Sequence, residues 1–178
     1  MRLEQHIVYT LKEWQYKLRG GDKHVRLYYP LDSLCGYLGL PMDSTMDAVM
    51  SETETYLREN ASYLGTPALY ESNGRVCIEI PEKGCAYVEK NVPLSEFLTG
   101  FLQALKQNSM QALRDYFAEF GAKHGGCVKE DVDEEDGDTV LYFEPEDVEP
   151  YVYCVNDDVL SITYHRFARA DYERSKKR

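Results

Sequence analysis

Residues 139–166 read TVLYFEPEDVEPYVYCVNDDVLSITYHR and decide the fold. β-Branched and aromatic residues gather there in three short runs, and such runs favour strands. We predict strands at Thr139–Glu144, Tyr151–Val155 and Val159–Arg166, separated by connections rich in acidic residues. Because consecutive strands with short connections form an antiparallel meander, we expect the end of the chain to be a sheet.

The alternation of side chains predicts how the last two strands pair. If Asn156-Asp157 forms a two-residue turn, Tyr153 faces Leu160 and Tyr151 faces Ile162 across the hairpin. A one-residue shift would mix polar and apolar side chains on both faces, whereas a four-residue loop would keep the faces unchanged. The predicted apolar face carries Tyr151, Tyr153, Val155, Leu160, Ile162 and Tyr164. The opposite face carries Val152, Cys154, Val159, Ser161, Thr163 and His165.

Amphipathic helices precede this meander and can cover its apolar face. Capping residues and apolar spacing predict about five to six helices. Their expected starts lie near Leu3, Pro30, Asp43 or Ser44, Glu82, Ser95 and Ser109. Glycines are expected to end three of these helices, at Gly20-Gly21, Gly39 and Gly121.

The fold class that follows is α+β, an antiparallel sheet with helices packed on one face. Asn73-Gly74 is the strongest hairpin signal in the chain, and it pairs Ser72 with Arg75. The pattern leaves open whether this hairpin shares a sheet with the meander. A chain of 178 residues suits a single domain. Its predicted parts are a helix-rich segment at 1–64, a hairpin with helices at 65–121, the meander at 122–167 and a basic tail at 168–178.

Composition narrows the classes of function. The net charge of −11 disfavours binding to nucleic acid, because phosphate groups repel such a chain. The five cysteines are odd in number and have no C-x-x-C spacing, which favours reduced thiols inside a cell. No run of apolar residues is long enough to cross a membrane or to form a secretion signal. We therefore expect a cytoplasmic protein.

The segment from Glu130 to Glu149 is unusually acidic, since eleven of its twenty residues are Asp or Glu and none is Lys or Arg. It lacks the ligand spacing of an EF-hand loop. Three interpretations remain open: solvated loops between strands, a docking rim for a basic partner, or a loose site for a divalent cation. A docking rim would steer association and make it sensitive to salt. The residues assigned to the rim are Glu130, Asp131, Asp133, Glu134, Glu135, Asp136, Asp138, Glu146, Asp147 and Glu149.

His165 and Arg166 are the alternative candidate site, a polar pocket for a small ligand or a reaction. Alternation along a regular strand points these two side chains to opposite faces, which argues against a shared site. Cys154 shares a face with His165 at a diagonal position, and burial is the favoured role of the cysteines. The four histidines lack metal-ligand spacing, and no nucleotide-binding or common hydrolase motif occurs. We therefore assign no catalytic residue, metal or cofactor.

Three groups of residues resemble a bacterial family of small proteins of unknown function, and the resemblance covers nearly the whole chain. They are Leu27-Tyr28-Tyr29-Pro30-Leu31-Asp32-Ser33-Leu34, then Pro81-x-x-Gly84-x-Ala86-Tyr87-Val88, then Tyr153-Cys154 with Tyr164-His165-Arg166-Phe167 and Asp171-Tyr172. The chain departs from the expected pattern at Ala168-Arg169-Ala170, where a different helix start would be typical. The resemblance implies a bacterial cytoplasmic origin and no activity.

The expected function is that of a non-enzymatic binding protein that holds a basic partner with its acidic rim. The 15 tyrosines fit either a protein interface or a half-buried sheet, because the ring is apolar and the hydroxyl is polar. The alternative is a small enzyme or ligand-binding protein that uses His165 and Arg166.

Overall fold

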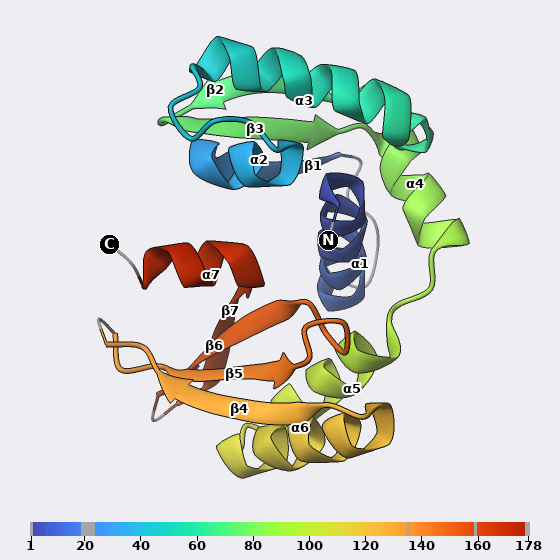
Figure 1. The fold of residues 1–178 in the computed structure, drawn as a ribbon. Coiled ribbons are helices and arrows are strands. Elements are labelled where there is room, and N and C mark those ends of the chain that lie inside the picture. Colours follow the sequence, from blue (N-terminus) through green and yellow to red (C-terminus); the bar gives the residue numbers. More distant parts are fainter. Residues whose placement is uncertain (1, 19–23, 135, 159, 177–178) are drawn as a thin grey trace. The chain divides into compact units, whose positions relative to one another are not determined.

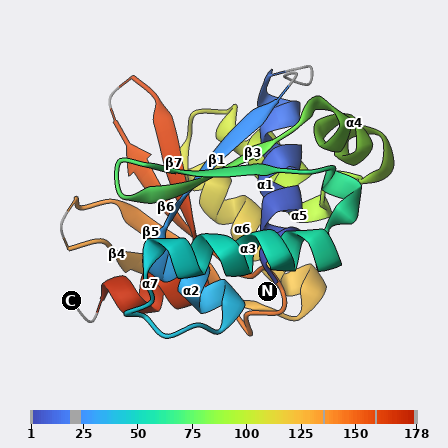
Figure 2. The same cartoon turned by 90° about the horizontal axis from the view of Figure 1, so that it is seen from above.

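The computed structural model describes residues 2–18, 24–134, 136–158 and 160–176. The chain divides into two compact units, residues 1–94 and residues 95–178, and each is described by itself. Figures 1 and 2 show the elements from two directions. The first unit holds α1 (Leu3–Leu18), β1 (Val25–Pro30), α2 (Leu31–Leu38), α3 (Met46–Asn60), the 3₁₀ turn η1 (Ser62–Leu64), β2 (Ala68–Ser72), β3 (Arg75–Ile80) and α4 (Glu82–Asn91). The second holds α5 (Glu96–Leu105), α6 (Met110–His124), β4 (Cys127–Val132), β5 (Thr139–Glu144), β6 (Tyr151–Asp157), β7 (Ile162–Ala168) and α7 (Arg169–Ser175).

The first unit is built on a three-stranded antiparallel sheet in the order β1-β3-β2. The predicted hairpin is confirmed, because Ser72 lies opposite Arg75. Asn73 and Gly74 both have positive φ, 52° and 73°, which is the backbone that a two-residue hairpin turn needs. The α+β class is confirmed, but this hairpin and the meander belong to two separate sheets.

Helices cover one face of this first sheet. Along β1 the side chains alternate between buried and exposed, so Leu27 is buried and Tyr28 is open to solvent. Leu27 lies opposite Ile78 on β3, and both join a core to which α1, α2, α3 and α4 contribute. α2 and α3 lie beside each other (Figures 1 and 2).

Local signals explain where these helices begin and end. α2 starts directly after Pro30 and stops before Gly39, whose φ of 68° is the left-handed value typical of a helix C-terminus. Thr45 caps α3, in place of the predicted Asp43 or Ser44, and its side chain accepts a hydrogen bond from the Ala48 N–H. The predicted glycine stop of α1 at Gly20-Gly21 lies outside the described residues.

The second unit contains the predicted meander, which β4 extends to a four-stranded antiparallel sheet in the order β4-β5-β6-β7. The strands follow one another in sequence and in space. Ser95 and Ser109 cap α5 and α6 as predicted, each accepting a backbone N–H from three residues onward. α6 does not end at Gly121 but continues to His124, with Gly125 in the left-handed conformation after it.

The predicted register of the last hairpin is wrong, although the predicted faces are largely right. Tyr153 lies opposite Arg166, not Leu160, and the strands close at Asp157 and Ile162. The connection is therefore a four-residue loop, 158–161, displaced by two positions from the loop considered in the sequence. Leu160 lies in this loop and is 86% exposed, so it does not belong to the apolar face. Moving the turn by an even number of residues preserves which side chains share a face.

Aromatic rings form the core of the second unit. α5 and α6 lie on one face of the sheet (Figure 1) and contribute Phe97, Phe101 and Phe117. These rings contact Tyr153 from the sheet, with ring centroids 5.3, 4.7 and 5.8 Å from the tyrosine ring. This is the cover that the apolar face of the meander requires.

α7 lies on the opposite face of the same sheet (Figure 1), where the sequence predicts a basic tail. Its Tyr172 is buried against Val140, Val152 and Cys154. The second sheet is therefore covered on both faces, not on one. None of the helices in the described part of the chain is both long and apolar enough to span a membrane.

Candidate functional site

The acidic segment does not form one rim, because β5 separates it into two parts. Residues 133–138 connect β4 to β5, and residues 145–150 connect β5 to β6. The two connections lie at opposite ends of β5, and six residues of strand span about 20 Å. Both views show the β4–β5 turn at the end of the sheet that also carries the β6–β7 loop (Figures 1 and 2).

The β4–β5 turn, the last residue of β6 and the first residue of the β6–β7 loop together make what we term the acidic end of the sheet. Asn156 Nδ2 donates a hydrogen bond of 2.7 Å to Asp138 Oδ1 and joins the end of β6 to the β4–β5 turn. Within the turn, the Asp133 N–H donates to the Asp138 carbonyl at 2.9 Å, and Gly137 takes the left-handed φ of 75°. The acidic end consists of Asp133, Glu134, Asp136, Asp138, Asp157 and Asp158.

Two carboxylates of the predicted rim are paired on β4 itself. The Arg114 guanidinium donates to both oxygens of Glu130, from Nη2 at 2.7 Å and from Nε at 3.1 Å, and this pairing raises the pKa of Arg114. The Lys176 ammonium is paired with Asp131 and lowers the pKa of that carboxyl group. These pairs hold α6 and α7 against the sheet and leave less negative charge on β4 than the sequence indicates.

The other rim residues lie elsewhere. Glu146 and Asp147 are exposed in the β5–β6 connection, at the far end of β5. Glu149 is only 5% exposed, and its Oε1 accepts a hydrogen bond of 2.9 Å from the buried Tyr153 hydroxyl. It therefore cannot be part of an exposed rim, and that assignment is corrected. Glu135 lies outside the described residues.

The structure does not bring His165 and Arg166 together. His165 is exposed on the face that carries α7, whereas the guanidinium of Arg166 lies on the other face, 4.2 Å from the centroid of the Tyr151 ring. The alternation expected from the sequence therefore holds, and the two side chains cannot share one pocket.

Cys154 lies directly opposite His165 in the register, not diagonal to it. Burial raises the pKa of the Cys154 thiol to about 12, and Asp133, Asp138 and Asp136 add to that rise. A thiol with such a pKa is protonated at neutral pH, so Cys154 is a poor nucleophile despite its neighbour. The favoured structural role fits this environment.

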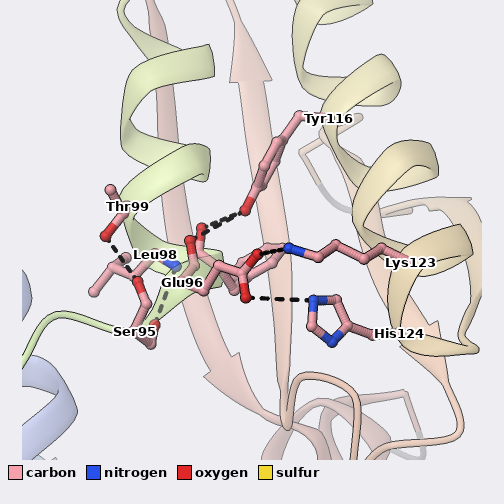
Figure 3. Close-up of polar contacts among 8 residues, drawn as sticks. Ser95, Glu96, Leu98, Thr99, Tyr116, Lys123 and His124 are labelled. Atoms are coloured by element: carbon pink, nitrogen blue, oxygen red, sulfur yellow. Dashed lines mark hydrogen bonds and ion pairs between the residues drawn. The ribbon is translucent and has the colours of Figure 1, made fainter.

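A groove of about 350 Å³ between α5 and α6 was not predicted from the sequence. Glu96 forms an ion pair with Lys123, and its Oε2 lies 3.5 Å from His124 Nε2 (Figure 3). The Tyr116 hydroxyl donates to the Phe97 carbonyl at 2.8 Å, and burial raises the pKa of this phenol. These contacts all run between the same two helices, so they join α5 to α6.

The sequence did contain one signal for this groove. Gly100 lies inside α5, where glycine is unfavourable for a helix. A Cβ at this position would lie only 2.3 Å from the Tyr116 ring, so the glycine permits the ring to pack against the helix. The ion pair of Glu96 with Lys123 joins residues far apart in sequence, and no local pattern predicts it.

A second pocket, of about 360 Å³, lies between the end of β4 and α7. This pocket depends on α7, the helix that forms within the segment 168–178 predicted to be a basic tail. Its lining residues are Asp131, Val132, Asp133, Glu134, Tyr172, Ser175 and Lys176.

A comparison with protein families tests the family resemblance that the sequence motifs indicate. The family model described as "Domain of unknown function, E. rectale Gene description (DUF3877)" matches residues 1–175. The chain belongs to the DUF3877 family. The predicted resemblance to a family of unknown function is therefore confirmed, and the match includes α7. No curated protein and no solved structure matches this DUF3877 chain.

Proposed function

We propose that this protein is a non-enzymatic binding protein whose acidic end holds a basic partner. One observation carries the proposal: the β4–β5 turn and residues 157–158, which are distant in sequence, lie at the same end of the sheet and place six carboxylates there. The hydrogen bond between Asn156 and Asp138 joins the end of β6 to the β4–β5 turn. Such a one-sided charge distribution would attract a basic partner and accelerate its association.

The distribution of cations supports the same proposal. Arg114 and Lys176 are both paired with carboxylates of β4, Glu130 and Asp131 respectively. Neither ion pair involves a member of the acidic end. These two ion pairs therefore neutralise carboxylates of β4.

Affinity capture with matched variants tests the proposal. The full chain is immobilised as wild type, as Glu134→Gln/Asp136→Asn at the acidic end, and as Glu146→Gln/Asp147→Asn at the far end of β5. Both double variants remove two exposed carboxylates, so they change the net charge equally. We expect a basic protein to be retained in stoichiometric amount by the wild type and the far-end variant. It should be lost from the acidic-end variant and in about 1 M salt, where the screening length falls to about 3 Å.

The comparison between the two double variants decides the outcome. If all three forms retain the same protein equally, or if both variants lose it equally, the location of the site at the acidic end is wrong.

A further inference from the structure

The residue that directly follows α7 is a lysine, and it lies beside the acidic end of the sheet. Lys176 lines the pocket next to β4 together with Asp131, Asp133 and Glu134. Asp133 and Glu134 are members of the acidic end, whereas Asp131 precedes them on the same chain segment. The protein therefore places one of its own cations next to the surface for which we propose a basic partner.

The Lys176 ammonium group is held by a carboxylate and an aromatic ring. It pairs with Asp131 and lies 4.7 Å from the centroid of the Tyr172 ring. Tyr172 is buried against the sheet, so its ring is a fixed surface for the lysine side chain. A carboxylate and an aromatic face are together a favourable environment for an alkylammonium group. Lys176 thus occupies the place that a lysine of a partner would otherwise find at Asp131.

This internal contact can be displaced without disturbing the fold. The side chains of Lys176 and Asp131 are 43% and 44% exposed, and an ion pair with that exposure is weak because water and salt screen it. α7 ends at Ser175, so Lys176 can leave Asp131 while Tyr172 remains packed on the sheet.

A cation bound at the acidic end would act directly on Lys176. Asp131 and Asp133 are two residues apart along an extended segment, so they lie about 7 Å from each other on one face. The screening length at physiological salt is about 8 Å. A partner's ammonium group at Asp133 would therefore repel the ammonium group of Lys176 at Asp131. The two positions disfavour simultaneous occupation by separate chains.

We propose that Lys176 makes an autoinhibitory contact: it competes with the basic partner, and binding of that partner releases it from Asp131. Because Lys176 belongs to the same chain, its local concentration at Asp131 is high and constant. A partner with a single cation competes poorly, whereas one that presents several cations together can displace the lysine. This inference rests on the function proposed above and adds a preference for partners with clustered basic residues.

NMR titration of the full chain with a short oligolysine peptide tests the inference in the wild type, Lys176→Met and Lys129→Met. Lys129→Met is the matched control, since it removes the same charge from an ion pair with Glu144 and Lys129 does not line the pocket. We expect Lys176→Met to bind oligolysine about two- to fivefold more tightly than Lys129→Met. This is the gain expected when competition from one exposed ion pair is lost.

A second measurement in the wild type separates competition from a change in net charge. The end of the Lys176 side chain lies close to the Tyr172 ring, so the ring current should shift the signals of its methylene protons. Saturation with oligolysine should return these signals to ordinary lysine values, because the partner releases Lys176. An effect of net charge alone would leave them shifted.

Equal affinities of Lys176→Met and Lys129→Met, or Lys176 signals that stay shifted at saturation, would overturn the inference and leave the proposed function standing. If oligolysine binds at the acidic end of none of the three proteins, the proposed function is wrong and the autoinhibitory contact fails with it. The two failures are therefore distinguishable in one set of titrations.

Discussion

At the scale of single residues, Glu149 and Tyr153 show how an acidic residue can belong to a core. The Tyr153 hydroxyl is the donor that compensates for burial of the Glu149 carboxylate. We predict that Tyr153→Phe lowers the free energy of unfolding by about 1–3 kcal/mol, because the buried carboxylate loses a hydrogen bond. Urea unfolding measures the change. Tyr28→Phe is the control, since Tyr28 is 48% exposed, and it should have no such effect. An equal effect of the two substitutions would show that the Glu149 contact does not stabilise the fold.

The cysteines differ sharply in their surroundings. Cys127 is exposed, whereas Cys35, Cys77, Cys85 and Cys154 are buried. The pKa of Cys154 is raised to about 12, so its thiol stays protonated as the pH rises from 7 to 9. We predict that a thiol reagent at pH 8 modifies one cysteine rapidly in the native protein and all five after unfolding. Mass spectrometry of the modified peptides identifies the rapid site. Fast modification of Cys154 would contradict its described burial.

At the scale of elements, α7 is expected to protect the face of the second sheet that lies opposite α5 and α6. Tyr172 packs on Cys154, Val140 and Val152. We predict that Tyr172→Ala, made in a Cys127→Ser background, increases the modification rate of Cys154 at least about tenfold, because α7 then opens more readily. Glu173→Ala on the exposed side of α7 serves as the control. If Tyr172→Ala leaves the rate unchanged, α7 is not the cover of this face.

The packing of α5 on α6 depends on the absence of a side chain at Gly100. We predict that Gly100→Ala lowers the free energy of unfolding by about 1–3 kcal/mol, because the new methyl group would overlap the Tyr116 ring. The same substitution in a Tyr116→Ala background should cost little, since the obstacle is gone and alanine favours a helix. Urea unfolding of the four proteins in this cycle gives the coupling. Additive effects would mean that Gly100 and Tyr116 do not contact each other as described.

Local patterns predicted most elements, and the failures have physical causes. The caps at Ser95 and Ser109 and the Asn73-Gly74 turn depend on neighbouring residues, so they can be identified from the sequence. The register at Tyr153 could not be identified, because parity constrains the face of a residue but not its partner. Helix α7 gains its stability from Tyr172 packing on a sheet, and no short segment shows that contact.

At the scale of the whole molecule, the site proved harder to predict than the fold. The acidic segment is continuous in sequence, and the prediction treated it as one surface. A strand of about 20 Å runs through its middle, so nearness in sequence does not mean nearness in space. The acidic end also includes Asp157 at the end of β6 and Asp158 after it, and the pocket beside β4 includes Tyr172 of α7 and Lys176 directly after that helix. Both depend on contacts between distant parts of the chain.

The most direct test of the central claim is an NMR titration of the labelled full chain with a short oligolysine peptide, recorded at low salt and near 0.15 M salt. We predict that amide shifts change chiefly at the acidic end, at Asp133, Glu134, Asp136, Asp138, Asp157 and Asp158. The changes should shrink at the higher salt concentration and in Glu134→Gln/Asp136→Asn, but not in Glu146→Gln/Asp147→Asn. Shifts centred on Glu146 and Asp147, or spread evenly over both ends of β5, would contradict the claim that the acidic end is the binding surface.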